Sequence, residues 1–349
     1  TRPKRISLPD FFGRSLSLPD GPEAWSCRGK GDAVLLLGLG PGLPRQLPFF
    51  NGATEVYCLE SPRIASAVQQ ARAQAGLEPT PPLPANWREV AVDEAVALAA
   101  SCRCYVYMPG LRLDPQFWGP LLGRVDASQG GAKSELGRAV GGGRPVLLPG
   151  NDGQLLHQEL RHALAQCGLG PVVENLPQPQ FRSMAAAGGA SAAGDAFAAS
   201  WRDFLRGSKP EFLLSVNLRG LDAEGRIFHL CRAMGISVAL WFVDNPWHVL
   251  SGVKLPWWQD AHIYVTDAGF VDGLKAHGAE RVYHLPLAVA PHMWRELTSL
   301  PARLQPPLFV GRSAFPEKER FFAAASVPPE MEAEAASVLA RSTGPQDAP

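Results

Sequence analysis

Apolar and polar residues are arranged along the chain in blocks that predict buried strands separated by amphipathic helices. The clearest strand block is Ser237 to Val243 (SVALWFV), whose apolar residues do not alternate with polar ones, as in a strand buried on both faces of a parallel sheet. In Gly225 to Met234 the apolar residues instead share one helical face, and Gly235 can close the helix. The other predicted strands are Ala33 to Leu37, Glu55 to Glu60, Cys104 to Met108, Pro145 to Leu148, Glu211 to Val216, His262 to Thr266 and Val282 to Pro286, and the other predicted helices are Gly153 to Cys167, Asp195 to Gly207 and Asp267 to Gly278.

This order of elements predicts the α/β fold class, with two Rossmann-like, doubly wound parallel-sheet domains and right-handed crossovers. Pro177 to Gly194, rich in proline and then in alanine, glycine and serine, has the composition of a linker. The predicted units are an irregular amino-terminal arm at 1–30, a Rossmann-like domain at 31–176, a linker and bracing helix at 177–207, a second domain at 208–300, and the start of a truncated third domain with a disordered tail at 301–349.

Polar residues follow the apolar SVALWFV block directly, among them Asp244, Asn245 and His248. Ligands of open α/β sheets bind at the carboxyl ends of the strands, so these residues are candidates for a cleft, together with Thr266 and Asp267 after the next strand. The alternative is structural, because Asn-Pro opens turns and an aspartate after a strand often accepts hydrogen bonds from loop amides.

The run ALWFVDNP, followed by DAHIYVTDAGFVDGLKAHGAERVYHLPLAVAP, resembles the amino-terminal half of the CgeB-like (spore maturation protein) glycosyltransferases of the two-domain GT-B type, over about residues 210 to 315. Members of that family show a hydrophobic strand ending in Asp-Asp-Pro or Asp-Asn-Pro, a further strand ending in aspartate, and a helix ending in glycine. The chain departs from the family pattern at Ala290, where an acid is expected.

The resemblance implies a GT-B-like second domain that acts on a nucleotide-sugar donor and an unidentified acceptor. Leu308 to Gly311 (LFVG) resembles the first strand of the carboxyl-terminal GT-B domain, which supplies most donor contacts in the family. Too few residues follow to complete a domain of that kind. We therefore expect the donor domain to be absent or truncated and this chain alone to be inactive.

The predicted first domain has a glycine-rich turn after its first strand, with Gly38, Gly40 and Gly42. The spacing fails the dinucleotide fingerprint G-x-G-x-x-G, but it resembles the first motif of class I methyltransferases, including the spermidine-synthase-like ones. Glu60 ends the next strand, where such folds place the acid that bonds ribose hydroxyls, and Asp114 follows a later strand at the same predicted edge. Directly after Glu60, Ser61-Pro62 can start a helix, with the serine as its cap and the proline at its first position. The resemblance implies S-adenosylmethionine as an alternative ligand. The prolines at 44 and 48 argue against it, since they shorten or break the helix that would face the ligand.

Composition argues against nucleic-acid binding, a membrane span and a metal site. The chain has 349 residues, 46% of them hydrophobic, and 33 basic residues balance 33 acidic ones, so it lacks the basic footprint of a nucleic-acid-binding protein. No apolar run approaches the length of a membrane span and residues 1–30 lack the centre of a signal peptide, which makes a cytoplasmic location the expectation. The cysteines form no C-x-x-C hook and the histidines no i, i+4 pair, so we predict no metal site.

Three function classes remain open. The first and favoured one is a CgeB-like glycosyltransferase, or the amino-terminal part of one. The second is an S-adenosylmethionine-dependent, methyltransferase-like enzyme that uses Gly38, Gly40, Gly42 and Glu60. The third is a non-catalytic binding or scaffold protein that keeps both folds. The catalytic residues and the oligomeric state are not determined by the sequence, and fold analogy alone does not choose among the three.

Overall fold

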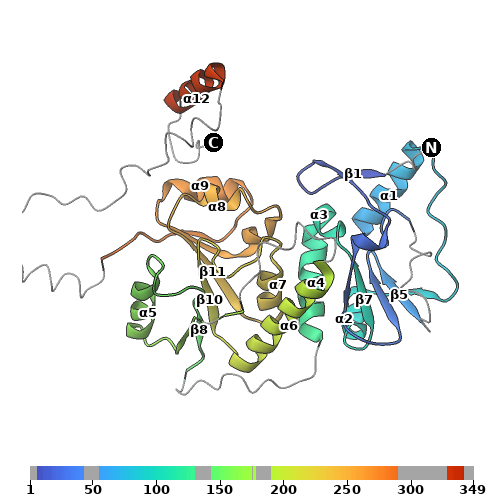
Figure 1. The fold of residues 1–349 in the computed structure, drawn as a ribbon, viewed down its shortest axis with the longest axis horizontal. Coiled ribbons are helices and arrows are strands. Elements are labelled where there is room, and N and C mark those ends of the chain that lie inside the picture. Colours follow the sequence, from blue (N-terminus) through green and yellow to red (C-terminus); the bar gives the residue numbers. More distant parts are fainter. Residues whose placement is uncertain are drawn as a thin grey trace, which may run out of the picture.

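The computed structural model describes residues 6–42, 55–129, 143–174, 176–177, 190–289 and 328–341. They form a mixed five-stranded sheet and a parallel six-stranded sheet, each flanked by helices, which confirms the predicted α/β class (Figure 1). A short hairpin of β1 (Ser7–Pro9) and β2 (Ser15–Ser17) precedes them. None of the helices in these ranges is both long and apolar enough to cross a membrane.

The first sheet has the strand order β3-β7-β4-β5-β6. Its centre is β4 (Val34–Leu37), every residue of which is buried, as its apolar sequence predicted. Parallel to it run β5 (Val56–Leu59) and β7 (Arg103–Tyr107), with β6 (Trp87–Glu89) beyond β5. In chain order these strands are first, second, fourth and third, so the sheet reads 3-2-1-4, as in a Rossmann half.

The edge strand β3 (Trp25–Arg28) pairs antiparallel with β7, so this sheet is mixed rather than wholly parallel. Its residues belong to the arm for which the sequence predicted irregular structure. A four-residue strand that includes a serine and an arginine gives no clear apolar pattern, and only its pairing with Tyr107 through Cys104 defines it. The short helical turn η1 (Pro22–Ala24) leads into it.

We call each sheet with its helices a unit. The helices of the first unit are α1 (Pro62–Gln74), α2 (Val92–Leu98), α3 (Gly110–Leu113) and α4 (Pro115–Ser128). The start of α1 is the one predicted from Ser61-Pro62. The Ser61 hydroxyl accepts a hydrogen bond from the Ile64 N–H at 3.4 Å, and Pro62 occupies the first helical turn, where its missing N–H costs nothing.

The second sheet has the order β13-β12-β11-β10-β8-β9, with all neighbours parallel. Its strands are β8 (Val146–Leu147), β9 (Val172–Val173), β10 (Phe212–Val216), β11 (Ser237–Phe242), β12 (His262–Val265) and β13 (Val282–His284). In chain order this sheet reads 2-1-3-4-5-6, which is the flavodoxin-like doubly wound order.

The strand at Pro145 to Leu148 was predicted to belong to the first domain, but β8 lies inside the second sheet. Val146 pairs with Phe212 of β10, and Leu147 pairs with Leu213. The division between the sheets therefore falls between Gln129 and Gly143, and not at the predicted boundary after residue 176. A short apolar run fits a buried strand in either sheet, so its pairing is decided by tertiary structure.

The helices that accompany the second sheet are α5 (His157–Gln166), α6 (Ala190–Ser208), α7 (Arg226–Ala233), α8 (Pro246–Leu250), the 3-10 turn η3 (Pro256–Asp260) and α9 (Gly269–Ala276). α6 begins before the predicted start at Asp195. A separate helix, α12 (Pro329–Arg341), occupies part of the segment for which a disordered tail was predicted. Its sequence PEMEAEAASVLAR is rich in good helix formers, which accounts for this difference.

Three predicted features lie outside the described residues, wholly or in large part: the linker from Pro177 to Gly194, the departure from the family pattern at Ala290, and the LFVG strand at 308–311.

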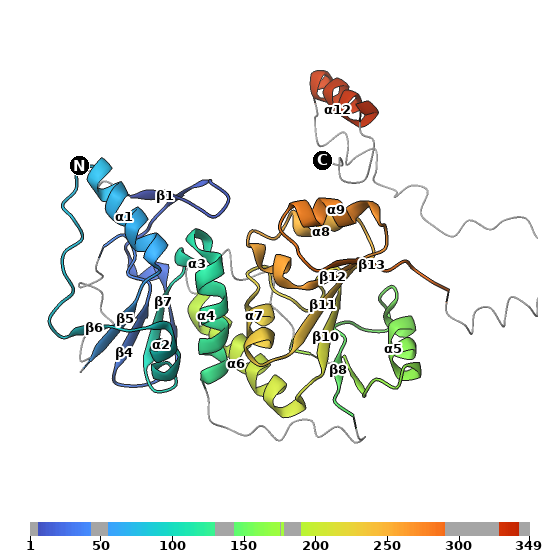
Figure 2. The ribbon, with the colours of Figure 1, turned by 180° about the vertical axis from the view of Figure 1, so that it is seen from behind.

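The helices α4, α6 and α7 lie between the two sheets in both views of the ribbon (Figures 1 and 2). Glycines let α4 and α7 approach closely. A Cβ atom on Gly119 would lie 2.3 Å from His229 Nε2, and one on Gly123 would lie 2.5 Å from the His229 carbonyl oxygen. Trp201 of α6 is fully buried in the core of the second unit.

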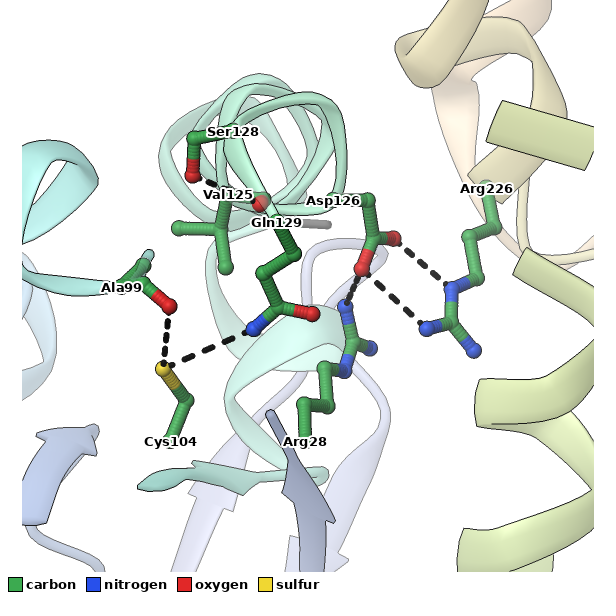
Figure 3. A network of polar contacts seen from close by, with 8 residues as sticks. All are labelled: Arg28, Ala99, Cys104, Val125, Asp126, Ser128, Gln129 and Arg226. Atoms are coloured by element: carbon green, nitrogen blue, oxygen red, sulfur yellow. Dashed lines mark hydrogen bonds and ion pairs between the residues drawn. The ribbon is translucent and has the colours of Figure 1, made fainter. Parts of the chain in front are cut away.

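A buried ion triad ties the two units together at this contact (Figure 3). Asp126 of α4 accepts a hydrogen bond from Arg28 Nη1 of β3 at 2.8 Å and another from Arg226 Nε of α7 at 2.8 Å. Burial by itself raises the pKa of Asp126, but the two guanidinium groups outweigh it and hold that pKa below its usual value. Residues 28, 126 and 226 thus form a single electrostatic unit, although each comes from a different part of the chain.

Candidate functional site

The second sheet reverses its strand order between β8 and β10, and the loops that follow these two strands form the switch point of the fold. The loop after β8 runs from Leu148 to α5, and the loop after β10 begins at Asn217. The two loops touch, because a Cβ atom on Gly220 would lie 2.4 Å from the Pro149 Cβ. By the general rule for open α/β sheets, this carboxyl edge is where a ligand is expected.

Unusual backbone conformations gather at this edge. Leu156, Asn217 and Leu218 have φ angles of 65°, 49° and 62°, and they are three of the four non-glycine residues with positive φ in the described part of the chain. Asparagine tolerates this region, but leucine rarely enters it and does so at an energetic cost. Strain of this kind persists where the surrounding structure enforces it, and it is concentrated at functional sites.

Asp244 lies at this edge, where the sequence placed it, and its side chain is exposed. Asn217 holds it in place: Asn217 Nδ2 donates to Asp244 Oδ2 at 2.6 Å, while Asn217 Oδ1 accepts the Val243 N–H at 3.1 Å. The carboxylate is thereby oriented by the residue that follows the neighbouring strand, while Asp244 stays exposed. Asn217 was not among the predicted residues, because it follows a strand without any motif.

The other predicted residues of this edge have mainly structural contacts. Asn245 accepts the Trp247 N–H at 2.9 Å and so caps α8, as the turn-forming alternative predicted. Asp267 accepts the Gly269 N–H at 2.8 Å at the start of α9. Thr266 Oγ1 donates to the Val243 carbonyl at 3.4 Å, next to Asp244. His248 is exposed on α8. The structure therefore places all five residues after β11 and β12, and Asp244 has the most suitable environment for binding a ligand.

The same edge continues at β8 and β9 with residues that the sequence analysis missed. His157 Nε2 lies 3.0 Å from Glu174 Oε1, and Arg161 bridges Glu174 and Asp152 at 3.3 and 3.1 Å. The burial of His157 and its position opposite two acids were not predictable, because β9 was not predicted and β8 was assigned to the first sheet.

The glycine-rich turn of the first sheet also lies at a switch point, between β4 and β7. There the space is taken by a side chain of the protein. A Cβ atom on Gly38 would lie 2.7 Å from Tyr107 Cβ, and one on Gly40 would lie 3.3 Å from the Tyr107 ring. The Tyr107 hydroxyl donates to the Pro19 carbonyl at 2.8 Å, so the arm covers the ring. The close approach that these glycines permit is used for packing against Tyr107.

Glu60 stands beside this turn, and both of its oxygens accept backbone N–H groups: that of Leu39 at 2.7 Å and that of Ser61 at 2.8 Å. Burial, together with the nearby Asp114 carboxylate, outweighs these two hydrogen bonds and raises the pKa of Glu60 to about 7. Ser61 Oγ donates to Asp114 Oδ2 at 2.5 Å, so the structure joins Glu60, Ser61 and Asp114.

Gly42 ends the described part of this turn, near Arg72, whose Nη1 donates to the Pro41 carbonyl at 3.0 Å. The segment after Gly42 lies outside the described residues. That the turn and Glu60 together line a cleft stays a prediction.

A cavity of about 230 Å³ lies between the two units. Its walls come from α3 and α4 on one side and from α7 and η3 on the other, with His229, Glu224 and Trp257 among its lining residues. Burial lowers the pKa of His229 to about 4, so its imidazole is neutral at physiological pH. Gly119 of α4, which packs against the His229 ring, also lines the cavity.

Comparison of the chain with protein-family models, with curated proteins and with solved structures finds no match. A function for the site is therefore argued from the residues of the site and their contacts.

Proposed function

We propose that the second unit binds a nucleotide sugar or its acceptor at the carboxyl edge of the six-stranded sheet, and that the protein is a glycosyltransferase or the amino-terminal part of one. The observation that carries the proposal is the exposed Asp244 carboxylate, held by Asn217 at the end of a buried central strand. The resemblance of ALWFVDNP to CgeB-like glycosyltransferases supports it, since Asp244 is the acid of that motif.

The proposed chemistry assigns Asp244 to the acceptor. In glycosyl transfer an acceptor hydroxyl attacks the anomeric carbon, the bond from that carbon to the diphosphate oxygen breaks, and a base takes the hydroxyl proton. An exposed carboxylate with a fixed orientation suits this role. Stabilising the departing diphosphate requires groups on the other side of the donor, and those are expected from a donor domain. We therefore expect these 349 residues to bind the ligand at the Asp244 edge.

A thermal-shift screen with nucleoside diphosphate sugars tests the proposal. A ligand at about 100 times its dissociation constant stabilises a protein by roughly 2.7 kcal/mol. Asp244→Asn should leave folding intact and abolish the shift, whereas Asp272→Asn, which changes another exposed acid of the same unit, should retain it. An equal shift in both variants would contradict the assignment.

S-adenosylmethionine binding by the first unit is the second candidate, because Glu60 follows β5 and accepts the N–H of Leu39 in the glycine turn. In that case Glu60→Ala should weaken the binding of S-adenosylmethionine by removing the ribose contact, and an unchanged affinity in a titration would exclude this role. A protein that responds to neither class of ligand would favour the scaffold alternative.

A further inference from the structure

Three side chains with metal-binding atoms meet at the switch-point edge of the second sheet. Asp152 belongs to the loop after β8, His157 is the first residue of α5, and Glu174 directly follows β9. One carboxylate oxygen from each acid and one ring nitrogen of His157 all lie within 4.8 Å of one another. Parallel strands bring these residues together, because β8 and β9 end at the same edge.

The histidine of this group is buried, and one of its ring nitrogens lacks a hydrogen-bond partner within the described residues. His157 is only 1% exposed, and among the described residues its Nε2 has no hydrogen-bond partner, although it lies 3.0 Å from Glu174 Oε1. A buried polar atom without a partner costs about 1–3 kcal/mol, and in a native structure it calls for an explanation. A cation between this nitrogen and the carboxylate would supply one.

The backbone around His157 fixes its ring in place. Leu156 precedes it with a left-handed φ of 65°, and the ring lies so close to Gly150 that a Cβ atom there would be 2.5 Å from His157 Nδ1. Only a glycine at position 150 leaves room for the ring. The imidazole is thus held toward Glu174 by two special backbone positions, as a ligand that is oriented in advance requires.

A cationic side chain already bridges the two acids. Arg161 lies one helical turn after His157, and its guanidinium contacts Asp152 Oδ1 at 3.1 Å and Glu174 Oε1 at 3.3 Å. Its side chain is 43% exposed, so it can move into solvent without breaking the core. The site therefore attracts positive charge, and Arg161 neutralises the acids when no other cation does.

We infer that Asp152, His157 and Glu174 form a site for a divalent transition metal ion such as Zn²⁺, with Arg161 displaced when the ion binds. Imidazole with carboxylates suits Zn²⁺ and similar ions better than Mg²⁺ or Ca²⁺, which prefer oxygen ligands alone. Ligands about 2.0–2.2 Å from Zn²⁺ are about 3.3–3.6 Å apart in a tetrahedron, so the His157 to Glu174 separation of 3.0 Å is close to one edge.

Asp152 becomes the third protein ligand after a small movement of its loop. Its side chain is 53% exposed and so has room to move. The fourth position is left for water or a ligand, as in catalytic rather than structural zinc sites. The sequence predicted no metal site because His157 and His162 have the wrong spacing to chelate an ion together. The inferred site needs only one of them, and it does not depend on the glycosyl-transfer proposal.

Titration of the chelator-treated full chain with Zn²⁺ by calorimetry, and with Co²⁺ by visible absorption, tests the inference. The wild type should bind one equivalent. Glu174→Gln and Asp152→Asn should each weaken binding at least about tenfold. Because His157 is buried and its replacement endangers folding, these two acid variants carry the test. His162→Gln, which changes an exposed histidine of the same helix, is the matched control and should not change the affinity.

Arg161→Gln separates a metal site from an ion-pair network. If the guanidinium competes with the ion, this variant should bind Zn²⁺ more tightly than the wild type. Unchanged or weaker binding in Arg161→Gln would contradict the inferred site. So would the lack of one-equivalent binding by the wild type at millimolar Zn²⁺, or a loss in the acid variants no larger than that in His162→Gln.

Discussion

The two sheets present their switch-point edges in opposite ways. At the first sheet the Tyr107 ring fills the space beside Gly38 and Gly40, and the arm covers it through the Pro19 carbonyl. At the second sheet Asp244 is oriented by Asn217 but stays exposed, and strained loops hold His157 against Glu174. Similar strand orders thus lead to one edge closed by packing and one edge that presents polar groups. A glycine-rich turn alone does not identify a binding site.

The contact between the two units differs from both edges, because a buried group of three charged side chains lies there. Asp126 is almost fully buried between Arg28 and Arg226 and receives charge-assisted hydrogen bonds from both. A buried pair of this kind gives little net stability compared with apolar packing, but it is costly to break. The triad therefore makes the relative position of the two units sensitive to a single residue.

The largest effect is expected from Asp126→Asn, which breaks the link between the two units that carry the two edges. The amide keeps the shape of the side chain but leaves two guanidinium groups without their counter-charge, so the free energy of unfolding should fall by roughly 3–5 kcal/mol. Urea-induced unfolding measures it. Asp93→Asn is the control, since Asp93 pairs with Arg124 at the surface with 88% of its side chain exposed. It should cost less than about 1 kcal/mol. Similar losses in both variants would refute a structural role for the triad.

Gly38→Ala tests whether the first edge is closed by packing. Gly38 has a φ of 96°, and an added Cβ would lie 2.7 Å from Tyr107 Cβ. Backbone strain and overpacking together should lower the free energy of unfolding by roughly 3 kcal/mol. At Gly76, with a φ of 64°, nothing lies within 4 Å of the added atom. Gly76→Ala should therefore cost only about 1 kcal/mol. Equal costs in urea unfolding would mean that Tyr107 does not fill this edge.

Glu60→Gln tests how a buried carboxyl group at the edge of the first sheet makes stability depend on pH. The pKa of Glu60 is raised from 4.5 to about 7, so between these values the folded state binds a proton that the unfolded state does not bind. The free energy of unfolding therefore falls as pH rises from about 4.5 to 7, by about 2 kcal/mol from this group. Unfolding measured at pH 5 and pH 7.5 should show a smaller fall in Glu60→Gln than in the wild type. Glu78→Gln, which changes an exposed glutamate, should leave the fall unchanged. A wild-type pH profile in Glu60→Gln would contradict the burial of this carboxyl group.

The smallest effect is expected at the strained second edge. Leu156→Gly relieves a left-handed conformation that costs a leucine about 1–2 kcal/mol. Because glycine also raises the conformational entropy of the unfolded chain, the free energy of unfolding should rise by only roughly 0.5 kcal/mol. Leu155→Gly is the control: this neighbour is 70% exposed and has no such strain, so its replacement should lower stability. A loss in Leu156→Gly as large as that in Leu155→Gly would show that the left-handed position carries no strain.

Local patterns predicted the elements that bury an apolar face or carry a cap. The runs at β4 and β11 are found where they were expected, and α1 begins at Ser61-Pro62. The start of α5 was displaced, because Gly153 to Leu156, which were predicted to begin the helix, form turns instead. The short strands β3 and β9 were not predicted, since their burial depends on the partner strand and not on their own sequence.

The sequence by itself determined the α/β class, the central strands and the position of Asp244 at a strand end, because burial on both faces of a parallel strand demands an apolar run that ends where the loop begins. Only the tertiary structure decided that β8 joins the second sheet, that Tyr107 fills the glycine turn, and which distant residues meet. The triad of residues 28, 126 and 226 and the group of residues 152, 157 and 174 have no spacing that a sequence pattern reports. Strand pairing and helix packing bring them together, and these depend on long-range contacts that no local pattern of residues specifies.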